Sequence, residues 1–197
     1  TEQAIYVEGE SDLAFNETDF IEFYGRRNDG TLDAQLYKTP SLQPHSYYNL
    51  YSDTSSYFLT IGSVPGKRMT FFSENNAGLS DETFHHDEKL LVLTNRYAPG
   101  IDFTDVQETS FGLGEGWTGN QILLNQVATY ELTNVVLGVP SAGLLVLEVL
   151  LVGRGPATHQ VEIYGGASLV AAGTVEGFEA KRFSGAINWT DIDINGK

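Results

Sequence analysis

Oxygen-bearing side chains recur at alternate positions between Glu8 and Asp19. They fall at the first, third, fifth, ninth and twelfth places of a twelve-residue loop, and Ala14 at the seventh place offers its backbone carbonyl. This is the ligand spacing of a calcium loop, because alternate residues of a tight loop converge on one ion. The sequence therefore predicts a calcium site, with the ligands Glu8, Glu10, Asp12, Ala14, Asn16 and Asp19.

Two positions depart from the usual calcium loop. Leu13 occupies the sixth place, where the sharp turn favours glycine, and Asp19 is shorter than the usual closing glutamate. No helical pattern flanks the loop on either side. An acidic surface turn between two strands is therefore the alternative interpretation of the same residues.

Two histidines and two carboxylates follow one another in His85-His86-Asp87-Glu88. Adjacent side chains of a strand point to opposite faces, so neighbouring histidines rarely bind one ion together. Only His86 and Glu88 share a face. We interpret this run as a half-exposed strand, and we rank a metal-dependent hydrolase built on it below the other hypotheses.

Aromatic side chains could form a platform that stacks on sugar rings. Trp117 lies in the glycine-rich run Gly112–Gly119, and Tyr47 and Tyr48 are adjacent in the chain. Tyrosine and tryptophan also fill cores and line sheet edges. The sequence thus leaves two readings open for Trp117, Tyr47 and Tyr48: a carbohydrate-binding surface, or ordinary packing.

Catalytic motifs are missing from the 197-residue sequence. It contains no G-x-S-x-G turn for a serine nucleophile and no phosphate-binding glycine loop followed by a helix. It has no cysteine, which rules out disulfides and a cysteine nucleophile within this span. Acidic residues number 26, so no single pair can be nominated as glycosidase carboxylates. We expect no catalytic residue in this chain.

The charge balance bears on partners. Asp and Glu number 26 against 11 Lys and Arg, which gives a formal net charge of −15. Such a field repels nucleic-acid phosphates and anionic lipid surfaces. The longest apolar run, Gly143–Val152, contains Glu148 and is too short to span a bilayer. We expect neither nucleic-acid binding nor membrane insertion.

Short runs of Tyr, Phe, Val, Thr and Ile separated by Gly, Asn, Asp and Pro predict strands throughout the chain. No window predicts an amphipathic helix. The expected strands are Ala4–Val7, Phe20–Tyr24, Tyr47–Tyr51, Tyr57–Ile61, Arg68–Phe72, Lys89–Leu93, Thr129–Leu132, Leu144–Val152, Gln160–Tyr164, Ser168–Ala172 and Phe178–Phe183.

The later strands indicate the architecture. Leu144–Val152 is apolar on both faces apart from Glu148, which predicts a central, covered strand. Gln160–Tyr164 alternates as a half-exposed strand does, and Gly165-Gly166 makes the next turn. The pattern predicts an all-β fold, a jelly-roll-like β-sandwich preceded by a smaller β unit.

A polar, turn-rich stretch at Ser73–Thr83 predicts the boundary between these two parts. We therefore expect a small β unit with the acidic loop over residues 1–80 and the β-sandwich over residues 81–197. The last residues before Lys197 resemble the start of a strand and a turn, so we expect the fold to continue beyond them.

The run from Ala4 to Gly25 resembles a segment ahead of the catalytic domain of gingipain-like cysteine peptidases of Bacteroidetes, which include the surface peptidase of type IX secretion. That segment reads V-E-G-E-x-D-G-x-F-D-x-x-D-Y-I-x-F-Y-G, and the departures of this chain that bear on the calcium prediction are Leu13 and Asn16. The resemblance continues through Asn49–Asp53 and Tyr57–Thr60, and more softly through His86–Glu88, Gly114–Gly119 and Leu144–Gly153.

The resemblance implies an exported, non-catalytic β-sandwich module, because the catalytic histidine and cysteine of such peptidases lie beyond the matching span. Its implied role is to support, orient or mask a peptidase domain of the same polypeptide, or to bind a protein or glycan at the cell surface. The implied location is the outer-membrane surface or the extracellular space of a Gram-negative bacterium. The competing hypothesis is a free-standing carbohydrate-binding module.

Overall fold

The structure, a computed structural model, describes residues 2–75, 77–102, 108–135 and 143–192. The chain forms two compact units: Thr1–Asn28 with Ser52–Asp81 make unit 1, and Asp29–Tyr51 with Glu82–Lys197 make unit 2. The chain therefore passes between the units after residues 28, 51 and 81. The sequence predicted a single boundary, after residue 80, and it gave no sign that residues 29–51 join the later part.

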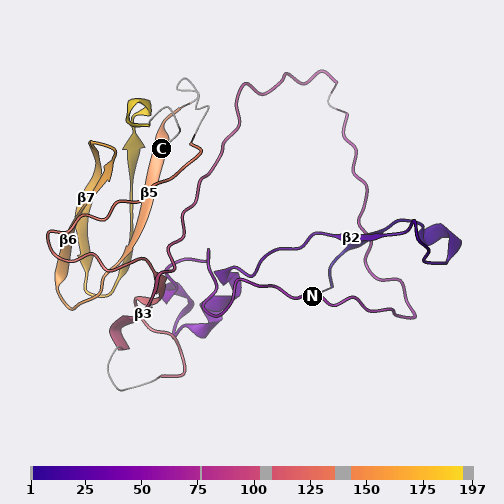
Figure 1. Ribbon diagram of the computed structural model, residues 1–197, viewed down its shortest axis with the longest axis horizontal. Coiled ribbons are helices and arrows are strands. Elements are labelled where there is room, and N and C mark those ends of the chain that lie inside the picture. Colours follow the sequence, from indigo (N-terminus) through magenta and orange to yellow (C-terminus); the bar gives the residue numbers. More distant parts are fainter. Residues whose placement is uncertain (1, 76, 103–107, 136–142, 193–197) are drawn as a thin grey trace. The chain divides into compact units, whose positions relative to one another are not determined.

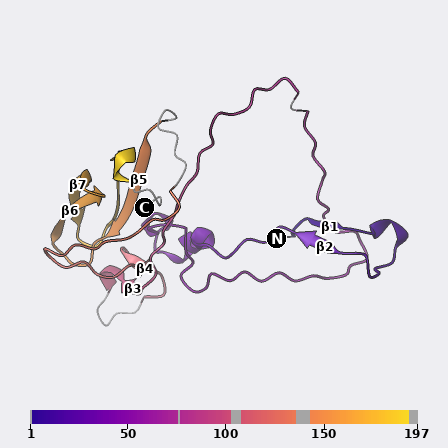
Figure 2. The same cartoon turned by 45° about the horizontal axis from the view of Figure 1, so that its top comes forward.

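Unit 1 is built on a short antiparallel pair of strands, β1 (Ile5–Val7) and β2 (Ile21–Phe23), which Figure 2 labels side by side. The 3₁₀ turn η1 (Glu10–Asp12) lies in the loop that joins them. Arg68 pairs in parallel with Ile5, and the N–H of Met69 donates to the Ile5 carbonyl at 2.8 Å. β1 is thus held from both sides, by β2 and by the chain around residue 68.

Unit 2 begins with two 3₁₀ segments, η2 (Gly30–Leu36) and η3 (Pro40–Leu42). Later come the strand β3 (Arg96–Pro99), the turn η4 (Gly100–Asp102) and the strand β4 (Glu115–Thr118). β3 and β4 pair antiparallel, with Tyr97 opposite Trp117. Tyr37, directly after η2, forms an isolated parallel β-bridge with Phe111. This bridge connects the early segment of unit 2 to the chain just before β4.

The rest of unit 2 is a set of four strands, β5 (Leu145–Val152), β6 (Thr158–Gly165), β7 (Ser168–Glu176) and β8 (Ala180–Ile187), followed by η6 (Trp189–Asp191). β5 pairs with β8 and β6 pairs with β7, both antiparallel. Figure 1 draws these strands together in orange and yellow. Their order is that of one long hairpin whose closed end is the turn at Gly165–Ser168.

This long hairpin, the folded ribbon, bends back on itself halfway along. Hydrogen bonds continue across the bend, from Gly153 N–H to the Glu179 carbonyl at 2.9 Å and from Gly177 N–H to the Ala157 carbonyl at 3.1 Å. Residues 153–157 cross the bend on one strand and residues 177–179 on the other.

The two halves of the folded ribbon pack against each other through β7 and β8. Val175 and Phe183 are buried there. A side chain at Gly185 would collide with the Val170 carbonyl, and one at Gly173 would come within 3.0 Å of the Phe183 ring. Glycine at these two positions lets the strands approach closely. The burial of Val175 and Phe183 makes this the apolar centre of the ribbon.

The all-β fold class is confirmed, while the jelly-roll-like sandwich stays a prediction. Among the described residues β5 pairs only with β8, and Val146 is 61% exposed, so β5 is not the covered central strand that was expected. Five expected strands form no strand there: 47–51, 57–61, 68–72, 89–93 and 129–132. β3 and β4 were not expected. The predicted continuation at residues 193–197 lies outside the described residues.

Candidate functional site

The acidic loop of unit 1 has its side chains engaged in local hydrogen bonds. Asp12 Oδ1 accepts from the Ala14 N–H at 2.9 Å, and Asp19 Oδ2 accepts from the Asn16 N–H at 2.8 Å. Asn16 Oδ1 accepts from the hydroxyl of Thr18 at 2.8 Å. The oxygens predicted as calcium ligands thus act here as turn-forming acceptors.

Glu10 leaves the loop and pairs with Arg68. Arg68 Nε lies 2.8 Å from Oε1 and 3.0 Å from Oε2 of Glu10, and Nη2 also donates to Oε1. This hydrogen bonding lowers the pKa of the Glu10 carboxyl. Glu8 accepts a hydrogen bond from the Tyr6 hydroxyl. A calcium ion in the loop would have to compete with Arg68 for Glu10.

At the sixth place of the loop, where the spacing favours glycine, the backbone adopts a conformation that glycine prefers. Leu13 adopts the left-handed conformation with φ 62° and ψ 15°, although its side chain is 96% exposed and gains no burial there. Gly9 has φ 83° and its missing side chain leaves space that Asp19 occupies. In the part of the chain that the structure describes, no three His, Asp or Glu side chains lie together as a metal site. The calcium site stays a prediction.

The His85–Glu88 run was predicted to be a half-exposed strand, but in the structure it forms no strand and all four residues are exposed. Asp87 pairs with Lys89 at 2.7 Å, and the ring of His86 contacts that of Phe84 edge-on. These contacts are those of exposed side chains along an extended segment.

Trp117 belongs to a group of partly exposed aromatic side chains in unit 2. Its indole N–H donates to the Leu50 carbonyl at 2.9 Å. Its ring meets Tyr48 at 6.4 Å and 77°, and Tyr97 at 5.5 Å and 80°. Edge-to-face rings of this kind stabilise packing, whereas a sugar platform presents a flat exposed face. Trp117 and Tyr48, two of the three predicted ligand-binding residues, are therefore in contact but not coplanar.

Tyr47, the third predicted ligand-binding residue, lies apart from that group. Its ring stacks on His45 at 5.9 Å with an angle of 22°, and the Arg182 guanidinium lies 6.0 Å from the ring centre. Burial, and then the charge of Arg182, lower the pKa of His45 below its ordinary value of 6.5. Tyr47 thus belongs to a mixed aromatic and cationic group that includes β8.

Glu115 of β4 accepts three hydrogen bonds beside the aromatic group. Its carboxylate accepts from the Tyr97 hydroxyl at 2.6 Å and from the Gly112 N–H at 2.8 Å, and its carbonyl accepts from the Tyr37 hydroxyl at 3.0 Å. Burial, and then the bond to Glu115, raise the pKa of Tyr97. Burial likewise raises the pKa of Tyr37. Both phenols are therefore neutral hydrogen-bond donors at neutral pH.

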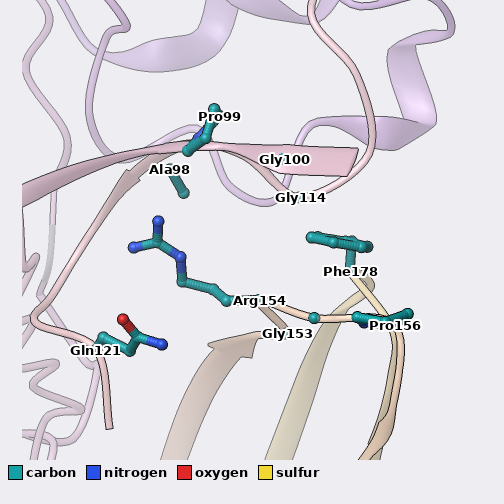
Figure 3. Close-up of a pocket in the computed structure, with 10 residues that line it drawn as sticks. Ala98, Pro99, Gly100, Gly114, Gln121, Gly153, Arg154, Pro156 and Phe178 are labelled. Carbon is teal, nitrogen blue, oxygen red and sulfur yellow. The ribbon is translucent and has the colours of Figure 1, made fainter. Parts of the chain in front are cut away.

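A pocket that was not predicted from the sequence lies at the bend of the folded ribbon. Its volume is about 460 Å³, and Figure 3 shows the side chain of Arg154 extending through it toward Ala98, with the Gln121 amide nearby. Within the described chain, Arg154 Nη1 is buried without a hydrogen-bond partner. The lining residues are Ala98, Pro99, Gly100, Gly114, Gln121, Gly153, Arg154, Gly155, Pro156 and Phe178.

The only sequence signal of this pocket was the turn Gly153-Arg154-Gly155-Pro156, where a cation stands between two glycines. Its other wall comes from β3 and the start of β4, about fifty residues earlier in the chain, which no local pattern could bring to it.

No helix among the described residues has the length and apolar character needed to cross a bilayer. No protein-family model, curated protein or solved structure matches the chain.

Proposed function

We propose that the chain is a non-catalytic β module of an exported, gingipain-like protein, and that unit 1 packs against the neighbouring peptidase domain to support and orient it. One observation carries this proposal. The segment Tyr57–Phe72 of unit 1 is extended and exposes most of its large apolar side chains to solvent: Tyr57, Phe58, Leu59, Ile61, Val64, Met69, Phe71 and Phe72.

Exposure on this scale calls for a partner. Phe58 is 90% exposed and Phe71 is 86% exposed. A buried phenylalanine side chain contributes roughly 1.5–3 kcal/mol relative to an exposed one. Contiguous apolar surface of this kind marks an interaction site in soluble proteins.

Part of the backbone of this segment makes no hydrogen bonds to other backbone groups in the described chain. Around residue 68 it bonds to Ile5, whose N–H donates to the Lys67 carbonyl at 3.1 Å. Between residues 58 and 66, all of which the structure describes, no backbone-to-backbone hydrogen bond forms. An extended stretch with unpaired N–H and C=O groups is suited to pairing with a strand of another domain.

Charge and chemistry favour a protein as that partner. Lipid cannot satisfy the unpaired backbone groups, and a net charge of −15 disfavours anionic membranes and nucleic acids. A protein domain supplies both an apolar face and a sheet edge. The assignment of that domain as a peptidase rests on the sequence resemblance.

Hydrogen exchange tests the proposal directly. Amides of residues 58–66 should exchange at unprotected rates in the isolated 197-residue chain and become protected in the full-length peptidase polypeptide. Amides of the β6–β7 ladder should be protected in both and serve as the internal control. Equal, unprotected exchange of residues 58–66 in both proteins would contradict the proposal.

Substitutions separate the interface from general surface effects. Phe58→Ser and Phe71→Ser should lower the thermal stability and the peptidase activity of the full-length protein while leaving the isolated chain folded. Leu169→Ser, at an exposed leucine of β7 in unit 2, is the matched control and should change neither property. If Leu169→Ser has the same effect, the loss does not arise from the proposed interface.

A carbohydrate-binding module is the second candidate. The observation that favours it is the nearly parallel stack of Tyr47 on His45, which resembles a flat binding face more closely than Trp117 does. A glycan array with the wild-type chain and Tyr47→Ala tests it. Binding that Tyr47→Ala abolishes would support this candidate, and a silent array would remove it.

A further inference from the structure

The bend of the folded ribbon directs one arginine away from both ladders. Gly153 N–H bonds to the Glu179 carbonyl, and the space where a Gly153 side chain would be is filled by the Gly177 carbonyl. The bend therefore closes tightly at Gly153. Arg154 follows directly, and its side chain crosses the pocket toward β3 (Figure 3).

One donor of the Arg154 guanidinium lacks a partner within the part of the chain that the structure describes. Nη1 is buried and has no hydrogen-bond partner among the described residues. Arginine stays charged at all ordinary pH values, so a buried unpaired donor on it is costly unless an anion completes the site. Arg68 and Arg182 show the contrast, since each pairs with a glutamate, Glu10 and Glu148 respectively.

The volume of the pocket beside this donor is that of a small-molecule site. Ala98, Pro156 and Phe178 line the pocket with apolar side chains, and the Gln121 amide offers a further donor and acceptor (Figure 3). A volume of about 460 Å³ lies within the ordinary range of small-molecule sites, roughly 300–1,000 Å³. Gly114 has φ 73°, and a side chain there would collide with the Phe178 carbonyl, so β4 and the ribbon meet closely at the pocket wall.

We infer that this pocket binds a small ligand through its carboxylate. The planar guanidinium fork matches a carboxylate and binds it through charge-assisted hydrogen bonds. The apolar walls would contact the body of the ligand, and Gln121 would bond a hydroxyl or amide next to the carboxylate. Two sources supply such a group at this size, a uronic acid and the free carboxyl end of a peptide. The inference does not depend on the proposed packing of unit 1.

Titration calorimetry with matched pairs of probes tests the inference. Sodium glucuronate is compared with glucose, and N-acetylphenylalanine with its carboxamide. The wild-type chain should bind at least one acid about tenfold or more tightly than its neutral analogue, because charge-assisted hydrogen bonds are roughly twice as strong as neutral ones. The acid that binds identifies the source of the carboxylate. If neither acid binds better than its neutral analogue, the inference is wrong.

Two variants assign the binding to Arg154. Arg154→Gln should lose the preference for the acid, whereas Arg96→Gln, at an exposed arginine of β3 outside the pocket, should keep it. Without ligand, Arg154→Gln should be at least as stable as the wild type, because it removes the buried Nη1 donor that lacks a partner among the described residues. This measurement also shows that the variant folds. A lost preference in both variants, or in neither, would overturn the assignment.

Discussion

Asn49 Nδ2 donates to Oδ1 of Asp33 at 2.6 Å. Both residues belong to the early segment of unit 2, residues 29–51. The other carboxylate oxygen of Asp33 accepts from the backbone N–H of Leu50 at 2.8 Å. Asp33 is 3% exposed and Asn49 6%. Since the Leu50 carbonyl in turn accepts from Trp117, this buried carboxylate fixes the segment against β4.

Asp33→Ala should therefore destabilise unit 2. It removes the buried carboxylate that accepts from Asn49 Nδ2 and from the Leu50 N–H, which we expect to cost about 3 kcal/mol. Both tryptophans of the chain, Trp117 and Trp189, belong to unit 2, so denaturant unfolding followed by tryptophan fluorescence reports this unit. Asp53→Ala, at an exposed aspartate of unit 1, is the control and should leave that transition unchanged.

The stability of unit 2 should decrease in mild acid because of His45. Its pKa is below 6.5 in the folded state, so the unfolded state binds the proton more readily. The contribution of His45 to the stability of unit 2 is constant above about pH 6.5. It falls as the pH is lowered from there toward the folded-state pKa of His45. The fluorescence-detected midpoint should be lower at about pH 5 than at about pH 7.5.

Replacing the histidine tests that origin. His45→Gln should flatten the pH dependence between these two values. His86→Gln, at an exposed histidine of the same unit, should retain the wild-type dependence. An unchanged slope in His45→Gln would show that other groups produce it.

Leu13→Gly should stabilise unit 1. The left-handed conformation costs a non-glycine residue about 1–2 kcal/mol, and the greater freedom of glycine in the unfolded chain offsets part of the gain. We expect a net gain of about 0.5–1 kcal/mol. The readout is exchange of the Glu8 amide, which donates to the Phe20 carbonyl at 2.9 Å. Exchange should slow several-fold in Leu13→Gly and stay unchanged in Leu13→Ala, which keeps the strained backbone.

The calcium prediction is tested by a calorimetric melt with calcium and then with excess chelator. Ligand linkage predicts a melting temperature several degrees higher with calcium, and the shift should disappear in Asp12→Ala. Arg68→Gln should enlarge the shift, because it frees Glu10 from its ion pair. Equal melts with and without calcium, in the wild type and in Arg68→Gln, would leave the loop as an acidic turn.

Sequence patterns predicted the parts of the fold that are local. The strands at Ala4–Val7 and Phe20–Tyr24, and the hairpin at Gly165-Gly166, correspond to β1, β2 and the β6–β7 turn. These predictions needed only the alternation of apolar and polar residues and a glycine turn. The segment around Tyr57–Ile61 has the same strand composition, yet it forms no ladder in the described chain, because a strand needs a partner that composition does not supply.

The missed elements depend on distant contacts. β4 contains Gly116, with φ 139°, and pairs with Pro99 at its first residue, features that predict a loop when the segment is considered alone. The Arg154 pocket needs β3 and the ribbon bend together. The geometry of the acidic loop was partly predicted. Leu13 occupies the position where a calcium loop favours glycine, and its backbone is left-handed.

The folded ribbon has a consequence for the order in which unit 2 assembles. Every pairing in it can form by zipping outward from the turn at Gly165–Ser168, so each new contact closes only a short additional loop. Hairpins of this kind nucleate in about 1–10 μs. The β6–β7 end should therefore form early, and the step that limits the rate should be the bend at Gly153, where the two halves meet and the Arg154 pocket first comes into existence.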